Sequence, residues 1–259
     1  MKVDSQIILS VITVAAYDLD RLKITLNSYI GAPNNVQFVL VYPIDDINTE
    51  SYVRKFLMDN NLRISIVRDL GQGIYVAMNL GSNISLGSYL MFWNAGDSCF
   101  SALNLFNLSR DLESLKPIWG FTQAIFNWRE PQDMTIKNVK NFALQRGGYV
   151  SHQTLVVSKS DFIYLGGFDE SLKVAADYRL IAQLWQLDEV SFFNYEVVEV
   201  EFPNFSGQNN RVGRIENIQI LFQVIPFKFI LVSLFFILRR ESNYALKRIW
   251  RLFSRTGEK

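Results

Sequence analysis

Short apolar runs alternate with amphipathic segments along the first hundred residues of the chain. The runs are rich in β-branched residues without polar alternation, which is typical of strands buried on both faces of a parallel sheet. Between them, apolar residues recur at helical spacing, as Leu22, Leu26 and Ile30 do after a cap at Asp18 or Asp20. This order predicts βαβ units with right-handed crossovers and a doubly wound α/β sheet. The predicted strands are 7–14, 36–42, 63–67 and 88–93, and the predicted helices are 18–30, 49–58 and 73–86.

The pattern loosens after residue 100. We predict a helix over 101–115, a strand over 118–126 and a polar loop around 128–131. Residues 177–187 again carry apolar side chains on one helical face, and 196–202 alternate in the manner of a half-exposed strand. The sequence contains no internal repeat and no low-complexity linker.

The C-terminal segment has a different character. Residues 229–238 are uncharged and mostly apolar, but the run falls short of the ~20 residues that a spanning helix needs. Basic residues interleaved with aromatic ones follow, which predicts a helix in the bilayer interface, attracted by anionic lipid. A C-terminal helix pair packed on the body, or a contact between subunits, remains the alternative. The basic residues are Arg239, Arg240, Lys247, Arg248, Arg251 and Arg255.

Composition narrows the class of protein. The 259 residues are 49% hydrophobic and 20% charged, which supports a sizeable core and excludes wholesale disorder. A net charge of +1 argues against nucleic acid as a partner. The charge is unevenly distributed along the chain. From Lys228 onward there are eight Lys/Arg and two Asp/Glu, whereas the residues before it include 18 Lys/Arg and 23 Asp/Glu, so a mildly acidic body precedes a basic tail.

The cellular compartment follows from two further features. Cys99 is the single cysteine, so no disulfide can form within the chain and a reducing compartment is expected. Residues 1–6 lack the charged start, apolar run and cleavage site of a signal peptide. We therefore expect a cytoplasmic protein, held peripherally on the inner face of the cytoplasmic membrane by its C-terminal segment.

Acidic and polar residues follow all four predicted strands of the first half, at 15–18, 42–46, 69–73 and 94–97. In open α/β sheets, ligands bind beyond the carboxyl ends of the strands. Carboxylates at this edge can hold Mg²⁺ or Mn²⁺ and accept hydrogen bonds from ribose hydroxyls. A metal held in this way would neutralise the charge of a departing diphosphate.

Five ordered motifs then define a resemblance. The segments 73–81 (GIYVAMNLG) and 85–97 (SLGSYLMFWNAGD) resemble the pattern GIYDAMNxG…xxGxYxxFLNxDD of bacterial family 2 glycosyltransferases. SHQ at 151–153, GGFDE at 166–170 and ADY at 176–178 match further motifs of that family in order. The resemblance covers about residues 7–207. It implies a GT-A fold, which is Rossmann-like, a nucleotide-sugar donor, a divalent metal and inversion at the anomeric carbon.

On the donor side, the resemblance assigns Asp97 to the metal, as the last acid of a DxD-type motif whose first position is Asn94. The alternative interpretation of Asp97 is a turn residue that follows a strand and has no metal role. His152, the single histidine, is a candidate contact for the metal, the diphosphate or the acceptor; its alternative is a structural role. The predicted donor-binding residues are Thr13, Tyr17, Asp46, Gly73, Asn79 and Asn94.

On the acceptor side, Asp177 matches the catalytic base of the family. A carboxylate there removes the proton of the acceptor hydroxyl as its oxygen attacks the anomeric carbon. An ordinary helix cap is compatible with that role, because a helix start holds a carboxylate firmly. The other predicted acceptor-side residues are His152, Gln153, Gly167, Asp169 and Tyr178.

The chain departs from the family on the nucleotide side. Tyr42 stands where the family has the acid of strand two, Gly71 where it has the acid before GIY, and Val76 where it has the Asp of GIYDAMN. Ala16-Tyr17 replaces a Tyr-Asn pair. These changes leave the donor base open, although a UDP-linked sugar is expected.

We expect residues 1–215 to form the GT-A domain, with a donor half of about 1–100 and an acceptor half of about 101–215. Residues 216–259 form the membrane-associating or oligomerising segment. The leading hypothesis is an inverting transferase that builds an envelope polysaccharide, such as O-antigen or capsule, or a glycolipid, on a lipid-linked acceptor. One rival is a transferase with a soluble acceptor and a tail that joins two subunits. The other is a catalytically weakened subunit that binds a partner enzyme or a glycan.

Overall fold

The predicted alternation of strands and helices is confirmed over the first hundred residues. The computed structural model describes residues 6–60, 62, 64–126, 151–187, 189–201 and 210–224. The donor half contains β1 (Leu9–Val14), α1 (Leu19–Ser28), β2 (Val36–Pro43), α2 (Ile47–Asp59), β3 (Ile64–Asp69), α3 (Ile74–Ile84) and β4 (Tyr89–Asn94). Asp18 is the cap of α1, because its carboxylate accepts the amide N–H of Arg21.

The second half contains short elements that the hydrophobic pattern did not predict. It consists of β5 (Ser98–Cys99), α4 (Ala102–Leu115), β6 (Trp119–Phe126), the 3-10 turn η1 (His152–Thr154), β7 (Leu155–Ser158), α6 (Lys159–Tyr164), α7 (Ala176–Leu187), β8 (Ser191–Val200) and α9 (Asn210–Val224). β8 begins five residues before the predicted strand. The predicted polar loop at 128–131 lies outside the described residues.

The eight strands within the described residues form one sheet in the order β3-β2-β1-β4-β7-β6-β8-β5. The first four are parallel, as predicted. The other half is mixed, because β7 is antiparallel to both β4 and β6, and β5 is antiparallel to β8. The sheet is thus parallel in its donor half and mixed beyond β4.

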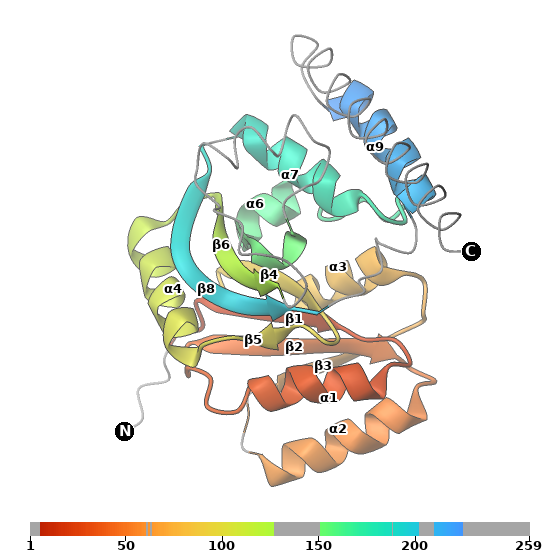
Figure 1. Cartoon of the computed structure of the whole chain (residues 1–259), viewed down its shortest axis with the longest axis vertical. Helices are drawn as coiled ribbons and strands as arrows, with labels where there is room; N and C mark the ends of the chain where they lie inside the picture. The colour runs from red at the N-terminus through yellow and green to blue at the C-terminus, as the bar shows by residue number, and fades with distance from the viewer. Residues whose placement is uncertain are drawn as a thin grey trace, which may run out of the picture.

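Helices cover both faces of the sheet (Figure 1). Alternate residues of β1 divide between two cores: Leu9 and Val11 pack with α1, α2 and α4, whereas Ile12 and Val14 pack with α3, α6 and α7. This division explains the unbroken apolar run, since both faces of the strand are buried. α9 lies outermost, against α7.

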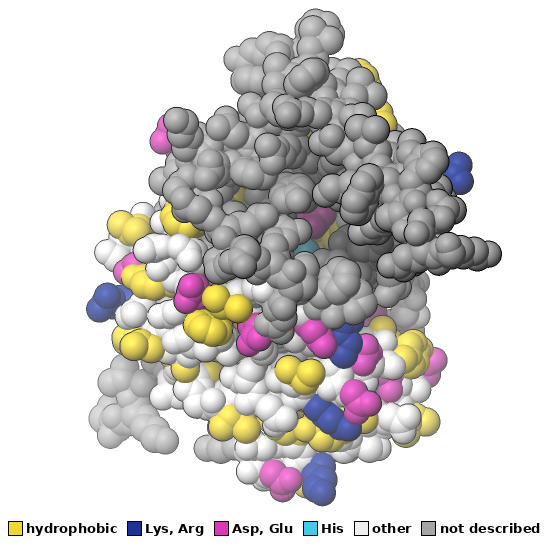
Figure 2. All heavy atoms as spheres, viewed as in Figure 1, with side chains coloured by type: hydrophobic (Ala, Val, Ile, Leu, Met, Phe, Trp, Pro, Cys, Tyr) yellow, Lys and Arg dark blue, Asp and Glu magenta, His cyan; other side chains and the backbone are white. Residues whose placement is uncertain are grey.

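The predicted boundary at residue 215 falls inside α9, which runs without a break to Val224. Residues 225–259, with the apolar run and the basic residues of the predicted tail, lie outside the described residues. No helix in the described part of the chain has both the length and the apolar character needed to cross a bilayer. On the face shown in Figure 2, acidic and basic side chains are interspersed over the described surface.

Candidate active site

The carboxyl ends of the parallel strands meet at one edge of the sheet, as the sequence predicts. Val14, the last residue of β1, lies in register with Asn94 of β4 on one side and with Val41 of β2 on the other. Pro43 of β2 pairs in turn with Asp69 of β3. The polar segments after these strands therefore share one rim.

Residues 94–97 form a tight turn at this rim. The Asn94 amide donates to Asp97 Oδ2 at 2.8 Å, and the Asp97 amide donates to the Asn94 carbonyl at 3.0 Å. Gly96 has a φ of +101°, and a Cβ on it would lie 2.0 Å from Glu201 Oε2. The positive φ favours glycine at this position, and a side chain there would also displace Glu201 from its ion pair with Arg21 at 2.7 Å.

Asp97 is almost completely buried, with 2% of its surface exposed. Its Oδ1 accepts the Glu201 amide at 3.3 Å, so each carboxylate oxygen has a backbone partner. Burial raises the pKa of Asp97, while the Asn94 amide and the nearby His152 oppose the rise. The turn role that the sequence suggested for Asp97 is present, and a metal contact would use the remaining lone pairs.

His152 reaches the same rim from the other half of the sheet. It opens η1, directly before β7, and β7 runs antiparallel to β4. The start of β7 therefore lies beside the end of β4, and Trp93 Nε1 donates to the Gln153 carbonyl at 3.1 Å. His152 Nε2 lies 3.4 Å from Asn94 Nδ2.

Asp177 lies in the first turn of α7 and faces the histidine. Its Oδ1 accepts the Tyr178 amide at 2.8 Å and lies 3.4 Å from the Tyr75 hydroxyl. Its Oδ2 lies 3.5 Å from His152 Nδ1, and the two side chains are 23% and 20% exposed, respectively. Asp177 thus accepts a backbone amide with one oxygen and turns the other toward His152, in a side chain that is partly exposed.

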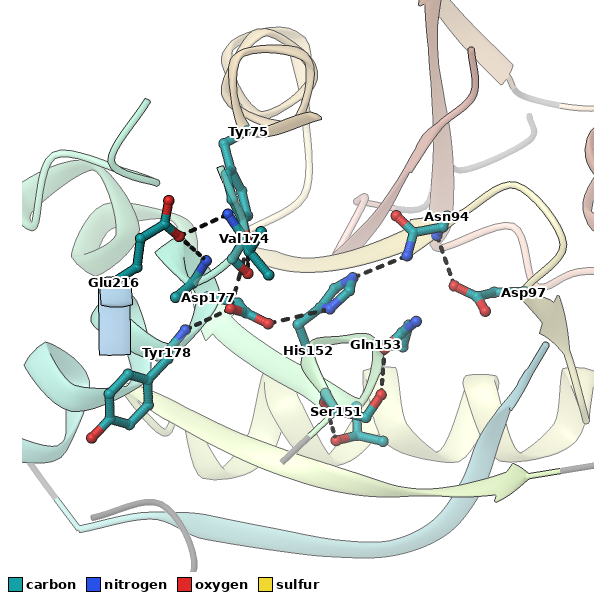
Figure 3. Close-up of polar contacts among 12 residues, drawn as sticks. Tyr75, Asn94, Asp97, Ser151, His152, Gln153, Val174, Asp177, Tyr178 and Glu216 are labelled. Atoms are coloured by element: carbon teal, nitrogen blue, oxygen red, sulfur yellow. Dashed lines mark hydrogen bonds and ion pairs between the residues drawn. The ribbon is translucent and has the colours of Figure 1, made fainter. Parts of the chain in front are cut away.

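The predicted catalytic and metal residues form one line of polar contacts (Figure 3). Tyr75 contacts Asp177, Asp177 contacts His152, His152 contacts Asn94, and the amide of Asn94 contacts Asp97. The line joins α3, α7, η1 and the turn after β4. It unites residues 102 positions apart in the chain, such as Tyr75 and Asp177.

The residues around Asn94 fit a divalent ion with oxygen ligands. Asn94 Oδ1 is buried and has no hydrogen-bond partner, while the Nδ2 of the same side chain faces His152 and its backbone amide contacts Asp97. Within the described ranges, no three His, Cys, Asp or Glu side chains gather as a ligand set. Mg²⁺ and similar ions are often held by one or two carboxylates together with substrate phosphates, which matches this sparse arrangement.

The donor-side loops are tied together. Tyr17 is 64% exposed, with a φ of 55°; its amide donates to Asp46 Oδ2 at 3.0 Å and its hydroxyl to Asp45 Oδ1 at 2.6 Å. The bond to Asp45 is the main reason that the pKa of the Tyr17 hydroxyl is raised. Asp46 also caps α2 through Thr49. Asp69 lies at the same edge, and its buried Oδ1 has no hydrogen-bond partner.

The remaining predicted donor residues differ in their surroundings. Thr13 is completely buried and its hydroxyl pairs with Tyr29, so its side chain supports the core and does not face the site. Gly73 is the residue before α3. The side-chain NH₂ of Asn79 donates to the Phe168 carbonyl and to Glu170 Oε1, each at 2.9 Å. Its side-chain oxygen accepts the backbone amide of Phe168, also at 2.9 Å. The structure thus joins Asn79 to the GGFDE loop of the acceptor half.

The GGFDE loop borders an open cavity of about 410 Å³. Gly167 has a φ of +72°, and a Cβ there would lie 2.7 Å from Asn79 Oδ1, so glycine permits the close contact of loop and α3. Asp169 bonds Ser171 and pairs with Arg179 of α7. The cavity is lined by Asn79, Leu165, Gly166, Gly167, Phe168, Asp169, Glu170, Ser171, Arg179 and Gln183.

Two predicted acceptor-side residues are buried. Gln153 is 1% exposed, and its side-chain oxygen accepts the Ser151 hydroxyl. Tyr178 is 2% exposed and packs with α9, and its backbone amide donates to Asp177. Neither side chain is placed to meet an acceptor directly.

Sequence reasoning missed two contributors. Tyr75 belongs to the GIY motif, which was the available signal, and burial raises the pKa of its hydroxyl, so it keeps its proton beside Asp177. Glu216 on α9 accepts three backbone amides just before α7. No motif marks Glu216, because its partners lie about 40 residues earlier in the chain.

Comparison with known proteins finds distant relatives. No protein-family model matches the chain. A protein of Mycobacterium bovis named PGL/p-HBAD biosynthesis glycosyltransferase is 24% identical over 156 residues, which cover 58% of this chain and 58% of the relative. A Mycobacterium tuberculosis protein of the same name matches equally well. The match therefore spans less than two thirds of the length of these curated relatives.

Solved structures share the fold. S. aureus TarS 1–349 in complex with UDP-GlcNAc has a TM-score of 0.68 at 16% identity, over 91% of this chain and 73% of that chain. The mannosyltransferase PcManGT from Pyrobaculum calidifontis, in complex with GDP-Man and Mn²⁺, has a TM-score of 0.60 at 15% identity, over 84% and 64%. The prediction of a GT-A fold is confirmed by these likenesses.

Proposed function

We propose that the protein is an inverting glycosyltransferase that moves a sugar from a nucleotide diphosphate to an acceptor hydroxyl. The observation that carries the proposal is the line of contacts from Asp177 through His152 and Asn94 to Asp97. It supports the proposal because the partly exposed Asp177 carboxylate lies at one end of this line and the residues that we propose for the metal-bound diphosphate lie at the other. The glycosyltransferase names of the mycobacterial relatives support the same activity.

In this proposal Asp177 is the general base. Its Oδ1 is held by the Tyr178 amide, while Oδ2 is available to take the proton of the acceptor hydroxyl. The acceptor oxygen then bonds to the anomeric carbon as the bond from that carbon to the diphosphate oxygen breaks on the opposite side. His152 orients the carboxylate, because its Nδ1 faces Oδ2.

We assign the donor-binding side of the site to the residues at the carboxyl ends of the parallel strands. Asn94 Oδ1, Asp97 and His152 would hold a Mn²⁺ or Mg²⁺ ion, which supplies positive charge beside the diphosphate when bound. Tyr17, Asp46 and Asp69 lie together at the neighbouring loops and would contact the nucleoside. The complex of TarS with UDP-GlcNAc supports a UDP-linked sugar as the donor.

A thermal-shift screen tests the donor and its metal together. We expect UDP with Mn²⁺ to raise the melting temperature of the full chain more than UDP with EDTA, and more than GDP or CDP with Mn²⁺. A ligand at 100 times its Kd stabilises the native state by about 2.7 kcal/mol, which corresponds to roughly 5–10 °C for a chain of this size. Absence of a shift with all nucleoside diphosphates would contradict a nucleotide-sugar donor.

The acceptor proposal rests on the C-terminal segment. Residues 229–238 are apolar, and six basic residues follow between Arg239 and Arg255. Such a segment gains from apolar insertion and adds about 1 kcal/mol per basic residue near an anionic surface. The proposal is a protein bound to the inner face of the cytoplasmic membrane, with a lipid-linked glycan of an envelope polysaccharide or glycolipid as acceptor.

Vesicle binding checks the membrane proposal. We expect the full chain to sediment with anionic vesicles, to bind neutral ones less, and to be partly released by high salt, which screens exposed charges. Deletion of residues 226–259 should abolish sedimentation and leave UDP binding intact, because the proposed donor residues all precede that deletion. Equal vesicle binding by both forms would overturn the proposal, and a change from dimer to monomer would favour a subunit contact instead.

A further inference from the structure

Glu216 connects helix α9 to the segment that carries Asp177. Its side chain is on α9 and only 7% of the residue is exposed. Its carboxylate accepts the amides of Lys173 at 2.8 Å, Val174 at 2.9 Å and Ala175 at 2.9 Å. Figure 3 shows Glu216 beside Val174. These three N–H groups immediately precede α7, where amides have no partner within the helix and the helix dipole favours negative charge.

The segment held by Glu216 has a second attachment. The Val174 carbonyl accepts the Tyr75 hydroxyl of α3 at 2.7 Å, and the same hydroxyl lies 3.4 Å from Asp177 Oδ1. α9 approaches the segment closely, since a Cβ on Gly213 would lie 3.0 Å from Val174 Cγ1. The turn before Asp177 is therefore fixed between α9 and α3.

Simple packing of α9 does not account for this carboxylate. Tyr178 and Ala182 of α7 already pack against Ile220 and Leu221 of α9 in a separate apolar cluster. A buried carboxylate costs free energy unless hydrogen bonds compensate, and hydrogen bonds to an ionised group are about twice as strong as neutral ones. The Glu216 carboxylate therefore fixes the conformation of the turn before α7, because it accepts hydrogen bonds from three consecutive backbone amides of that turn.

We propose that Glu216 is a positioning residue: by anchoring 173–175 it sets Asp177 opposite His152, so the placement of the base depends on α9. The inference rests on the proposed role of Asp177 as the base. Small displacements of a reacting group matter, because a misplacement of about 1 Å can lower a rate ~10²-fold. Since the donor residues lie on other elements, donor binding should not depend on Glu216.

The experiment compares Glu216→Gln with the wild-type full chain and with Gln219→Ala, a change at an exposed position of the same helix. Turnover is expressed per donor-binding site, counted by titration with UDP. We expect Glu216→Gln to lower kcat about 10-fold and to leave the donor KM within about 2-fold, because one oxygen replaces two. Hydrogen exchange of the amides of 173–175 should accelerate in this variant, and Gln219→Ala should match the wild type.

Glu216→Asp keeps the charge on a shorter side chain, so its kcat should lie between those of the wild type and Glu216→Gln. This variant also provides the test if Glu216→Gln does not fold. An unchanged kcat per donor-binding site with a lower melting temperature would reduce Glu216 to a stabilising role. A donor KM that rises with the loss of kcat would also overturn the inference. If the wild type does not transfer sugar, the proposed function fails, and the exchange of 173–175 alone decides whether Glu216 holds the turn.

Discussion

Asp177→Asn is expected to lower turnover at least ~10²-fold, the scale of a positioned general base. The variant should fold normally, because an amide oxygen can still accept the Tyr178 N–H that Asp177 Oδ1 accepts at 2.8 Å. The Tyr75 hydroxyl also keeps its bond to the Val174 carbonyl. What disappears is the basic oxygen that faces His152, so the acceptor proton has no carboxylate to receive it.

Steady-state kinetics with saturating donor, together with UDP titration, check this expectation. UDP affinity should stay within about 2-fold, because Asp177 acts on the acceptor hydroxyl and not on the diphosphate. Asp20→Asn serves as a matched control, since the Asp20 side chain is 93% exposed. Near-full turnover of Asp177→Asn would remove this residue from the mechanism. It would also favour the rival of a subunit that binds a partner or glycan without catalysis.

Asp97→Asn should weaken metal-dependent donor binding at least ~10-fold while the protein stays folded. The asparagine keeps one acceptor oxygen for the turn, and it removes a buried charge whose desolvation raises the pKa of Asp97. The lost charge is the one that would neutralise the ion beside the diphosphate. The effect should therefore appear in the presence of Mn²⁺ and vanish in EDTA.

Asp97→Ala separates the metal role from the turn role. It leaves the amides of Asn94 and Glu201 without their partner, at a cost of roughly 1–3 kcal/mol for each buried group. We expect a clear drop in the melting temperature in addition to the loss of UDP affinity, both measured on the same preparation. If wild-type UDP affinity is the same with Mn²⁺ and with EDTA, the metal assignment of Asp97 and Asn94 is wrong.

The sequence predicted the elements of the donor half because burial there follows a local rule. β1 is buried on both faces, so its apolar run needs no knowledge of its neighbours. The caps were equally local: Asp18 reaches an amide three residues along the chain. The shortest elements could not be predicted from the hydrophobic pattern. β7 has four residues, too few to show a period, and β5 has two.

Placement of side chains was the weaker part of the prediction. Thr13 lies near the end of β1, but its side chain turns into the core and pairs with Tyr29. Asn79 stands in a motif of the donor side, yet its amide joins the GGFDE loop, 89 residues away. In both cases the sequence indicated proximity to the rim, whereas the direction of the side chain depended on a partner distant in the chain.

The sequence by itself determined the strand–helix order of the first hundred residues and the edge of the sheet where the polar segments gather, because hydrophobic period is a local property. It also supplied the acids that we propose for the site, because motif spacing is local as well. Only the tertiary structure decided that His152 meets Asp177 and Asn94. That meeting requires β7 to run antiparallel beside β4, so that the start of one strand lies against the end of the other. Strand order and direction depend on contacts between distant segments, which no local period encodes. Glu216 could not be found from the sequence for the same reason, because its contact with the turn before α7 depends on the packing of α9 against α7.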